Sequence, residues 1–159
     1  MFTLADLVRL TGAKRRAVQL WAEAGAIKAD PMTERVGAGV HRTFSQDEAV
    51  IACFVAAFAL DSAPIGRLIL VGADMRAFLA GPYRHTIRKA IANNEKVFLI
   101  YDQVNRYPYP IATLDPDYVN TLHTYISEGM TENNYKANLI YLNGAFARLK
   151  AEPIFANYR

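Results

Sequence analysis

Residues 3–25 of this 159-residue chain read TLADLVRLTGAKRRAVQLWAEAG, two amphipathic segments separated by a break that contains Gly12. In residues 4–10 the apolar side chains recur three and four positions apart, which is the spacing of one helical face. A second helix is expected over residues 14–24. Two short helices joined by a three-residue turn with a glycine are typical of a helix–turn–helix.

Other residues of this stretch are typical of helix ends and of buried helix faces. Thr3 is followed three residues later by Asp6, which predicts a capping box at the start of the first helix. Gly25 suits the position just after the second helix, where a left-handed backbone is common. Val18 and Trp21 are expected to point inward.

Polar residues on the outer face of the second helix indicate contact with DNA. Arg15, Arg16 and Gln19 lie three and four positions apart, so we expect them on one face, opposite Val18. Arginine can pair with guanine and glutamine with adenine in the major groove, and Lys14 can contact a phosphate. The alternative is a solvated helix face that carries two arginines.

The following segment predicts a β-hairpin, the wing of the module. Its arms, residues 32–36 and 40–44, flank a short connection that contains two glycines. Arg35 lies on one arm, and His41 and Arg42 lie on the other. Basic side chains near the tip can hold the DNA backbone beside the groove, so we expect these three to contact phosphates.

The net charge of the chain is concentrated in the same region. The chain has a net charge of +3 and an isoelectric point near 9.0. Its first 46 residues contain seven basic and four acidic residues, and therefore carry this whole net charge. Any electrostatic attraction to nucleic acid is expected from the N-terminal third.

A twelve-residue apolar run, residues 49–60, predicts a buried core helix, since a membrane span needs about 20 residues. Ser45 and Glu48 predict a capping box at its start. Because it is apolar on all sides, either the C-terminal half or a second subunit must cover it. Its Cys53 is the single cysteine of the chain, expected to be a buried hydrophobe, which excludes an internal disulfide and a multi-cysteine metal site. A further helix is expected over residues 62–79.

Together, residues 2–79 resemble the DNA-binding module of the MerR family of transcriptional regulators, which runs helix, turn, recognition helix, hairpin wing and two further helices. The matching stretches read TLADLVRLTGAKRRAVQLWAEAGAIKADP and GVHRTFSQDEA, and PIGRLILV resembles the segment that leads toward dimerisation. Trp21 and Gly25 hold the places of the family's recognition-helix aromatic residue and terminal glycine. Arg42 and Phe44 match the arginine and aromatic residue of its wing. The resemblance implies that Trp21, Gly25 and Phe44 form the structural core of the module.

The chain also departs from the family. Gln19 lies at or beside a place where many members carry an arginine, so the resemblance transfers no base preference. After Gly81 there are no apolar heptads for the long coiled coil through which relatives pair. The cysteines of metal-sensing members are missing, and no metal or cofactor is expected.

The C-terminal half, residues 82–159, predicts a small α+β domain. Buried strands are expected at residues 97–101 and 139–142, and Pro108 and Pro110 are expected to flank a turn or an edge segment that ends near Thr113. Helices are expected at residues 83–93, at residues 115–129 and after Asn143.

All nine tyrosines lie in this half. Their amphipathic rings suit an interface with a partner or a second subunit, and a small-molecule pocket and ordinary core packing are the alternatives. There is no base–nucleophile pairing and no phosphate-binding loop, and His85 and His123 lack partners at metal-ligand spacing. We therefore expect neither catalytic residues nor enzymatic activity.

The sequence thus predicts an α+β protein, with a MerR-like winged helix–turn–helix over residues 1–81. Residues 82–159 would serve dimerisation, partner binding or effector binding. The expected function is that of a bacterial-type, sequence-specific transcriptional regulator. It would bind double-stranded promoter DNA as a homodimer, with RNA polymerase or a recombinase as a further partner.

The alternatives are an excisionase-like recombination directionality factor, which shapes DNA, and a protein adaptor that has lost DNA binding. Because no signal peptide or membrane span is recognisable, we expect a cytoplasmic protein without a membrane partner.

Overall fold

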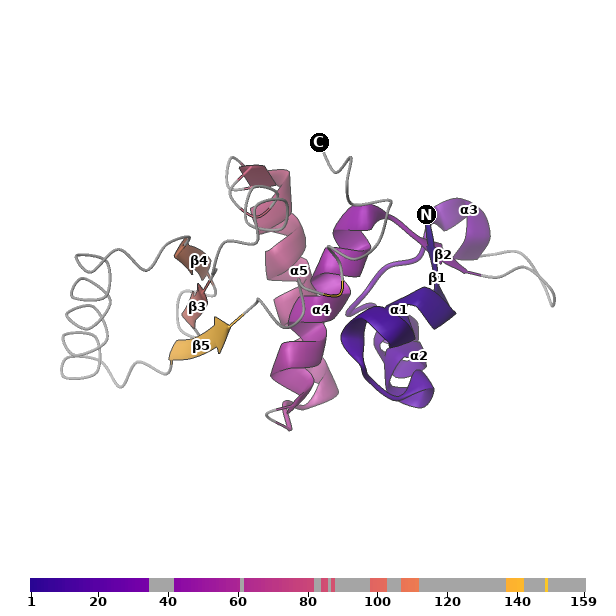
Figure 1. Cartoon of the computed structure of the whole chain (residues 1–159), viewed down its shortest axis with the longest axis horizontal. Helices are drawn as coiled ribbons and strands as arrows, with labels where there is room; N and C mark the ends of the chain where they lie inside the picture. Colours follow the sequence, from indigo (N-terminus) through magenta and orange to yellow (C-terminus); the bar gives the residue numbers. More distant parts are fainter. Residues whose placement is uncertain are drawn as a thin grey trace.

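The computed structural model describes residues 1–34, 42–60, 62–81, 84, 85, 87, 98–102, 107–111, 137–141 and 148. Over these residues the chain is α+β, as predicted: mainly helical, with a two-stranded and a three-stranded sheet. The helices are α1 (Leu4–Thr11), α2 (Arg15–Glu23), α3 (Pro31–Glu34), α4 (Gln46–Leu60) and α5 (Ile65–Ala80). The strands are β1 (Phe2–Thr3), β2 (Thr43–Phe44), β3 (Phe98–Asp102), β4 (Tyr107–Ile111) and β5 (Ala137–Tyr141). Figure 1 shows α4 and α5 at the centre, between the α1–α2 pair and the three-stranded sheet.

Helix α1 begins with the capping box that its sequence predicts. The N–H of Thr3 donates to Asp6 Oδ2 (2.8 Å), and the N–H of Asp6 donates to Thr3 Oγ1 (3.3 Å). The bonds from the Thr3 amide and hydroxyl, together with Arg9, hold the pKa of Asp6 below its usual value. The helix ends at Gly12, whose φ of 70° lets its N–H donate to the carbonyl of Val8 (2.9 Å).

The segment between α2 and α4 differs from the predicted hairpin. Residues 31–34 form the single turn α3 instead of a strand, because Asp30 caps this turn and a proline occupies its first position. Strand β2 pairs with β1, with Phe2 opposite Phe44. The expected tip of the hairpin, residues 35–41, lies outside the described residues.

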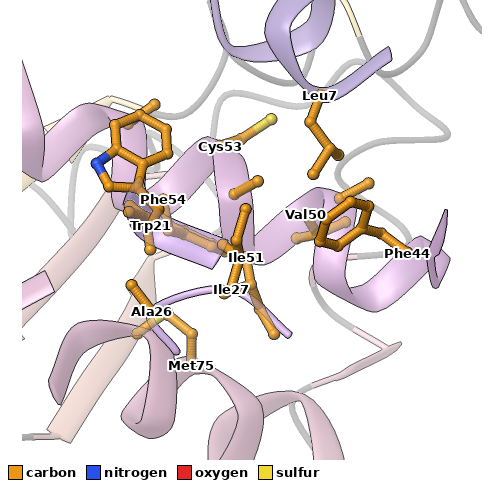
Figure 2. Close-up of a cluster of buried hydrophobic side chains, with 14 of the residues drawn as sticks. Leu7, Trp21, Ala26, Ile27, Phe44, Val50, Ile51, Cys53, Phe54 and Met75 are labelled. Carbon is orange, nitrogen blue, oxygen red and sulfur yellow. The ribbon is translucent and has the colours of Figure 1, made fainter. Parts of the chain in front are cut away.

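Helix α4 is the centre of the hydrophobic core. Ten of its residues are buried, and it packs against α1 and α5 of the same chain. Both helices lie within residues 1–81, whereas the C-terminal half or a second subunit was expected to cover it. In Figure 2, Leu7 of α1, Trp21 of α2 and Met75 of α5 lie around the side chains of α4. Cys53 is 1% exposed, as predicted, and burial raises the pKa of its thiol to about 12.

Helix α5 begins at Ile65, slightly later than predicted, because Ser62 has a left-handed backbone (φ 58°). Its Gly72 touches the segment that follows α2. A Cβ at Gly72 would clash with the carbonyl of Ala26, so glycine allows the two backbones to approach each other.

The three-stranded sheet is antiparallel and has the order β4-β3-β5. Strands β3 and β5 lie within two residues of the predicted ones. Pro108 and Pro110 lie within the edge strand β4, so of the two alternatives for this segment, a turn or an edge segment, the structure has the edge segment. Because proline has no N–H and residues two apart point the same way, both nitrogens face away from β3. The outer edge of β4 therefore offers no N–H donor at these two positions, which disfavours pairing with another strand.

Other predictions for the C-terminal half fall outside the described residues. These include the helix at residues 115–129, His123 and the tyrosine side chains. Of the helix predicted after Asn143, the structure describes only residue 148, which is helical. Of the predicted helix at residues 83–93, the structure describes only residues 84, 85 and 87, which are helical.

Candidate nucleic-acid interface

Helix α2 is positioned by the residues of its inner face. Val18 and Trp21 are buried, as is Phe44 on the neighbouring strand β2. Gly25 follows the C-cap Ala24 with a φ of 82°, and a Cβ there would meet nothing within 4 Å. Its role is therefore to permit the left-handed backbone that ends the helix, and not to make room for a neighbour.

The outer face of α2 carries the predicted DNA contacts. Arg15 and Arg16 are exposed, and Gln19 is partly exposed. Lys14 is the N-cap: its side chain is exposed, and its carbonyl accepts from the N–H groups of Ala17 and Val18. Because Val18 is buried on the opposite side of α2, the face that carries Arg15, Arg16 and Gln19 points toward solvent.

Arg15 and Gln19 line a surface hollow of about 540 Å³, together with Arg42. Arg42 reaches it because Thr43 pairs with Thr3, which brings the start of β2 beside the first turn of α1. The other described residues that line the hollow are Thr3, Leu4, Ala5 and Glu23. The hollow therefore brings together Arg15 and Gln19, two predicted base contacts, and Arg42, a predicted backbone contact from a distant part of the sequence.

The remaining predicted contacts are placed differently. Arg16 is not among the described residues that line the hollow: its guanidinium lies 3.7 Å from the carboxylate of Glu23, with side-chain exposures of 77% and 48%. An exposed pair of this kind contributes less than about 1 kcal/mol, so Arg16 can leave it for another partner. Arg35 and His41 lie outside the described residues.

Behind α2, a largely buried ion pair joins α4 to α5. Arg76 Nε lies 2.5 Å from Glu48 Oε1, and Arg76 Nη2 lies 3.0 Å from Glu48 Oε2. Arg76 Nη2 also donates to the carbonyl of Ala26 (2.9 Å), and the N–H of Lys28 donates to Glu48 Oε2 (2.8 Å). We call these four residues the Glu48–Arg76 network. It anchors the segment after α2 to the two central helices.

Sequence reasoning missed this network, although it did locate Glu48. The N–H of Glu48 donates to Ser45 Oγ (3.1 Å), as one half of the predicted capping box requires. Its carboxylate, however, is engaged by groups 20 and 28 positions away. The available signal was that α4 and α5, although mostly apolar, each carry charged residues, because buried charges need partners.

The described part of the chain contains no group of three or more His, Cys, Asp or Glu side chains that could hold a metal ion. Within the same residues, no helix combines the length and apolar character needed to cross a membrane. Comparison of the chain with protein-family models and with curated proteins finds no match.

Proposed function

We propose that this chain is a sequence-specific transcriptional regulator that binds promoter DNA through a MerR-like winged helix–turn–helix. The observation that carries the proposal is the hollow, where Arg15 and Gln19 of α2 lie near Arg42. Cationic and amide side chains around one concave surface suit a polyanion with hydrogen-bonding base edges.

The dimensions of α2 fit this role. As an α-helix, α2 is about 10–12 Å in diameter with its side chains, which fits the major groove, about 12 Å wide. Arg15, Arg16 and Gln19 would contact base edges. Lys14, Arg35, His41 and Arg42 would hold phosphates on either side.

A homodimer follows from the small size of one module. A single recognition helix reads few base pairs, whereas two copies read symmetric half-sites about 34 Å apart and gain both affinity and specificity. In the proposed dimer, the C-terminal half supplies the contact between subunits or to RNA polymerase.

The test is selection of bound fragments from a genomic duplex library, followed by affinity measurement across a salt series. We expect a palindromic motif at promoters, and an affinity that falls steeply as salt rises, because phosphate contacts release counterions. Enrichment at recombination attachment sites would instead indicate a directionality factor. A wild-type protein without salt-dependent binding would refute the proposal.

A matched pair of variants locates the interface. Arg15→Ala combined with Arg42→Ala should abolish enrichment of the motif. Arg67→Ala removes the same kind of charge from α5, outside the described lining of the hollow, and should leave the motif and the salt dependence unchanged. Equal effects of the double variant and of the α5 control would exclude the hollow as the interface.

A further inference from the structure

The hollow contains a residue that the proposed DNA contacts do not explain. Glu23 is the one acidic residue among the described residues that line it. It lies four positions after Gln19 and eight after Arg15, and therefore on the same face of α2. Any DNA duplex that contacts Arg15 and Gln19 therefore also approaches the carboxylate of Glu23.

A carboxylate at such a surface has a definite electrostatic consequence. DNA phosphates within a Debye length, about 8 Å at physiological salt, repel it. Repulsion alone would lower the affinity for every duplex equally. The carboxylate becomes favourable only where a hydrogen-bond donor of the DNA faces it, and in the major groove those donors are exocyclic amino groups.

Glu23 is available for such a donor. Its side chain is 48% exposed, and its contact with Arg16, at 3.7 Å, is longer than a hydrogen bond. An ionised carboxylate offers two oxygens and about four acceptor positions, which this long contact does not fill.

The choice between the two amino-bearing bases follows from their neighbouring groups. Adenine presents the acceptor N7 beside its amino group, and this acceptor repels a carboxylate, whereas cytosine presents the donor N4 amino group alone. Four helical residues advance by about 6 Å, nearly two base-pair steps of about 3.4 Å. The base that faces Glu23 therefore lies about two steps beyond the one that faces Gln19.

We propose that Glu23 is a specificity-determining residue, whose carboxylate accepts a hydrogen bond from the exocyclic amino group of a cytosine in the bound duplex. This inference rests on the proposed function. It assigns to Glu23 the discrimination of one base pair, distinct from the pairs read by Arg15 and Gln19.

The experiment is parallel selection from a duplex library with a random core of about two helical turns, about 20 base pairs, using the wild type and Glu23→Gln. We expect a cytosine in the wild-type motif that the variant no longer requires. Competition between the motif and its single-base variant should show discrimination reduced by a factor of roughly 5 to 150. Because glutamine both donates and accepts, the variant should tolerate adenine at this position, while the other positions of the motif stay unchanged.

Two further variants separate readout from charge. Glu23→Asp keeps the charge but shortens the side chain, so it should also lose the cytosine preference. Asp74→Asn removes one negative charge from α5, outside the described lining of the hollow, and should retain the preference. Uniformly higher affinity of Glu23→Gln for all duplexes, with an unchanged motif, would overturn the inference and leave the proposed function standing. A wild type that selects no motif would overturn both.

Discussion

Replacement of Arg76 by methionine tests whether the Glu48–Arg76 network holds the segment after α2 in place. Methionine keeps an unbranched apolar stem but removes the guanidinium. The Glu48 carboxylate then loses both of its bonds to Arg76 and keeps the one from the N–H of Lys28. The buried carbonyl of Ala26 loses the donor at 2.9 Å.

The expected magnitude follows from burial. Removing one partner of a buried ion pair costs about 3–5 kcal/mol, because the remaining charge has no counterion. The Arg76 side chain is 20% exposed and that of Glu48 is 12% exposed, so water can reach the pair partially. We therefore expect the lower end, about 3 kcal/mol of unfolding free energy, which is a large share of a total of about 5–15 kcal/mol.

Urea unfolding followed by the fluorescence of Trp21 measures this loss. Trp21 is the single tryptophan of the chain and is 4% exposed, so its emission reports on the packing of α2. A loss of this size lowers the midpoint by about 1–3 M urea. The control Arg67→Met makes the same chemical change on the same helix and should cost less than about 0.5 kcal/mol.

A double variant tests whether the two charges stabilise the fold as a pair. Glu48→Leu combined with Arg76→Met removes both charges, and should be more stable than the sum of the single losses predicts, because neither charge is left unpaired. Additive losses, or a cost below about 1 kcal/mol for Arg76→Met alone, would show that the pair is solvated and does not anchor α2.

Four further changes test other parts of the molecule. Gly72→Ala should lower the unfolding free energy by about 1–3 kcal/mol, measured by thermal unfolding, because its Cβ would meet the backbone of Ala26. The control Gly66→Ala, with open space around it, should be neutral or stabilising. Equal stabilities of the two variants would contradict the close approach at Gly72. On the proposed function, Arg42→Ala should weaken binding to all sequences alike and reduce the salt slope by about 1, and an unchanged slope would remove it from the phosphate contacts. Arg16→Ala should cost about 1–3 kcal/mol on the selected motif and relax one base position, so an equal loss on random DNA would argue against base readout. The thiol of Cys53 should resist an aromatic disulfide reagent at pH 8 until urea is added, and fast labelling of the native protein would contradict its burial. Because the pKa of this thiol is about 12 in the folded chain, above its ordinary value of 9.0, its contribution to stability should be present below pH 9.0 and fall as the pH rises toward 12.

The features that the sequence predicts well depend on short-range interactions. The Thr3–Asp6 box and the left-handed Gly25 each involve residues within a few positions, so their residue types suffice. The single turn α3 was within reach of the same rules, because Asp30 followed by a proline is a helix start. The glycines at positions 37 and 39, however, also favour a hairpin, which competes with this signal in the sequence.

Features that depend on distant pairing could not be predicted. Arg42 was expected on a hairpin arm, and it lies at the hollow because β2 pairs with the start of the chain. Likewise, α5 packs closely on the segment after α2 through Gly72 and Ala26, which lie 46 positions apart. A single sequence records neither pairing, since many partners satisfy the same hydrophobic pattern.

The core and the candidate site are nevertheless linked through one helix. Val18 and Trp21 fix the rotation of α2 about its axis, and the Glu48–Arg76 network fixes the chain that leaves it. The directions of Arg15 and Gln19 are therefore set by residues that do not line the described part of the hollow, which is how a rigid element can position a surface. On the proposed function, Arg76→Met should therefore weaken DNA binding in proportion to its unfolded fraction. Arg15→Ala should weaken DNA binding while the fluorescence of Trp21 stays unchanged. Loss of binding by a fully folded Arg76→Met would mean that the network also controls the orientation of α2 within the native state.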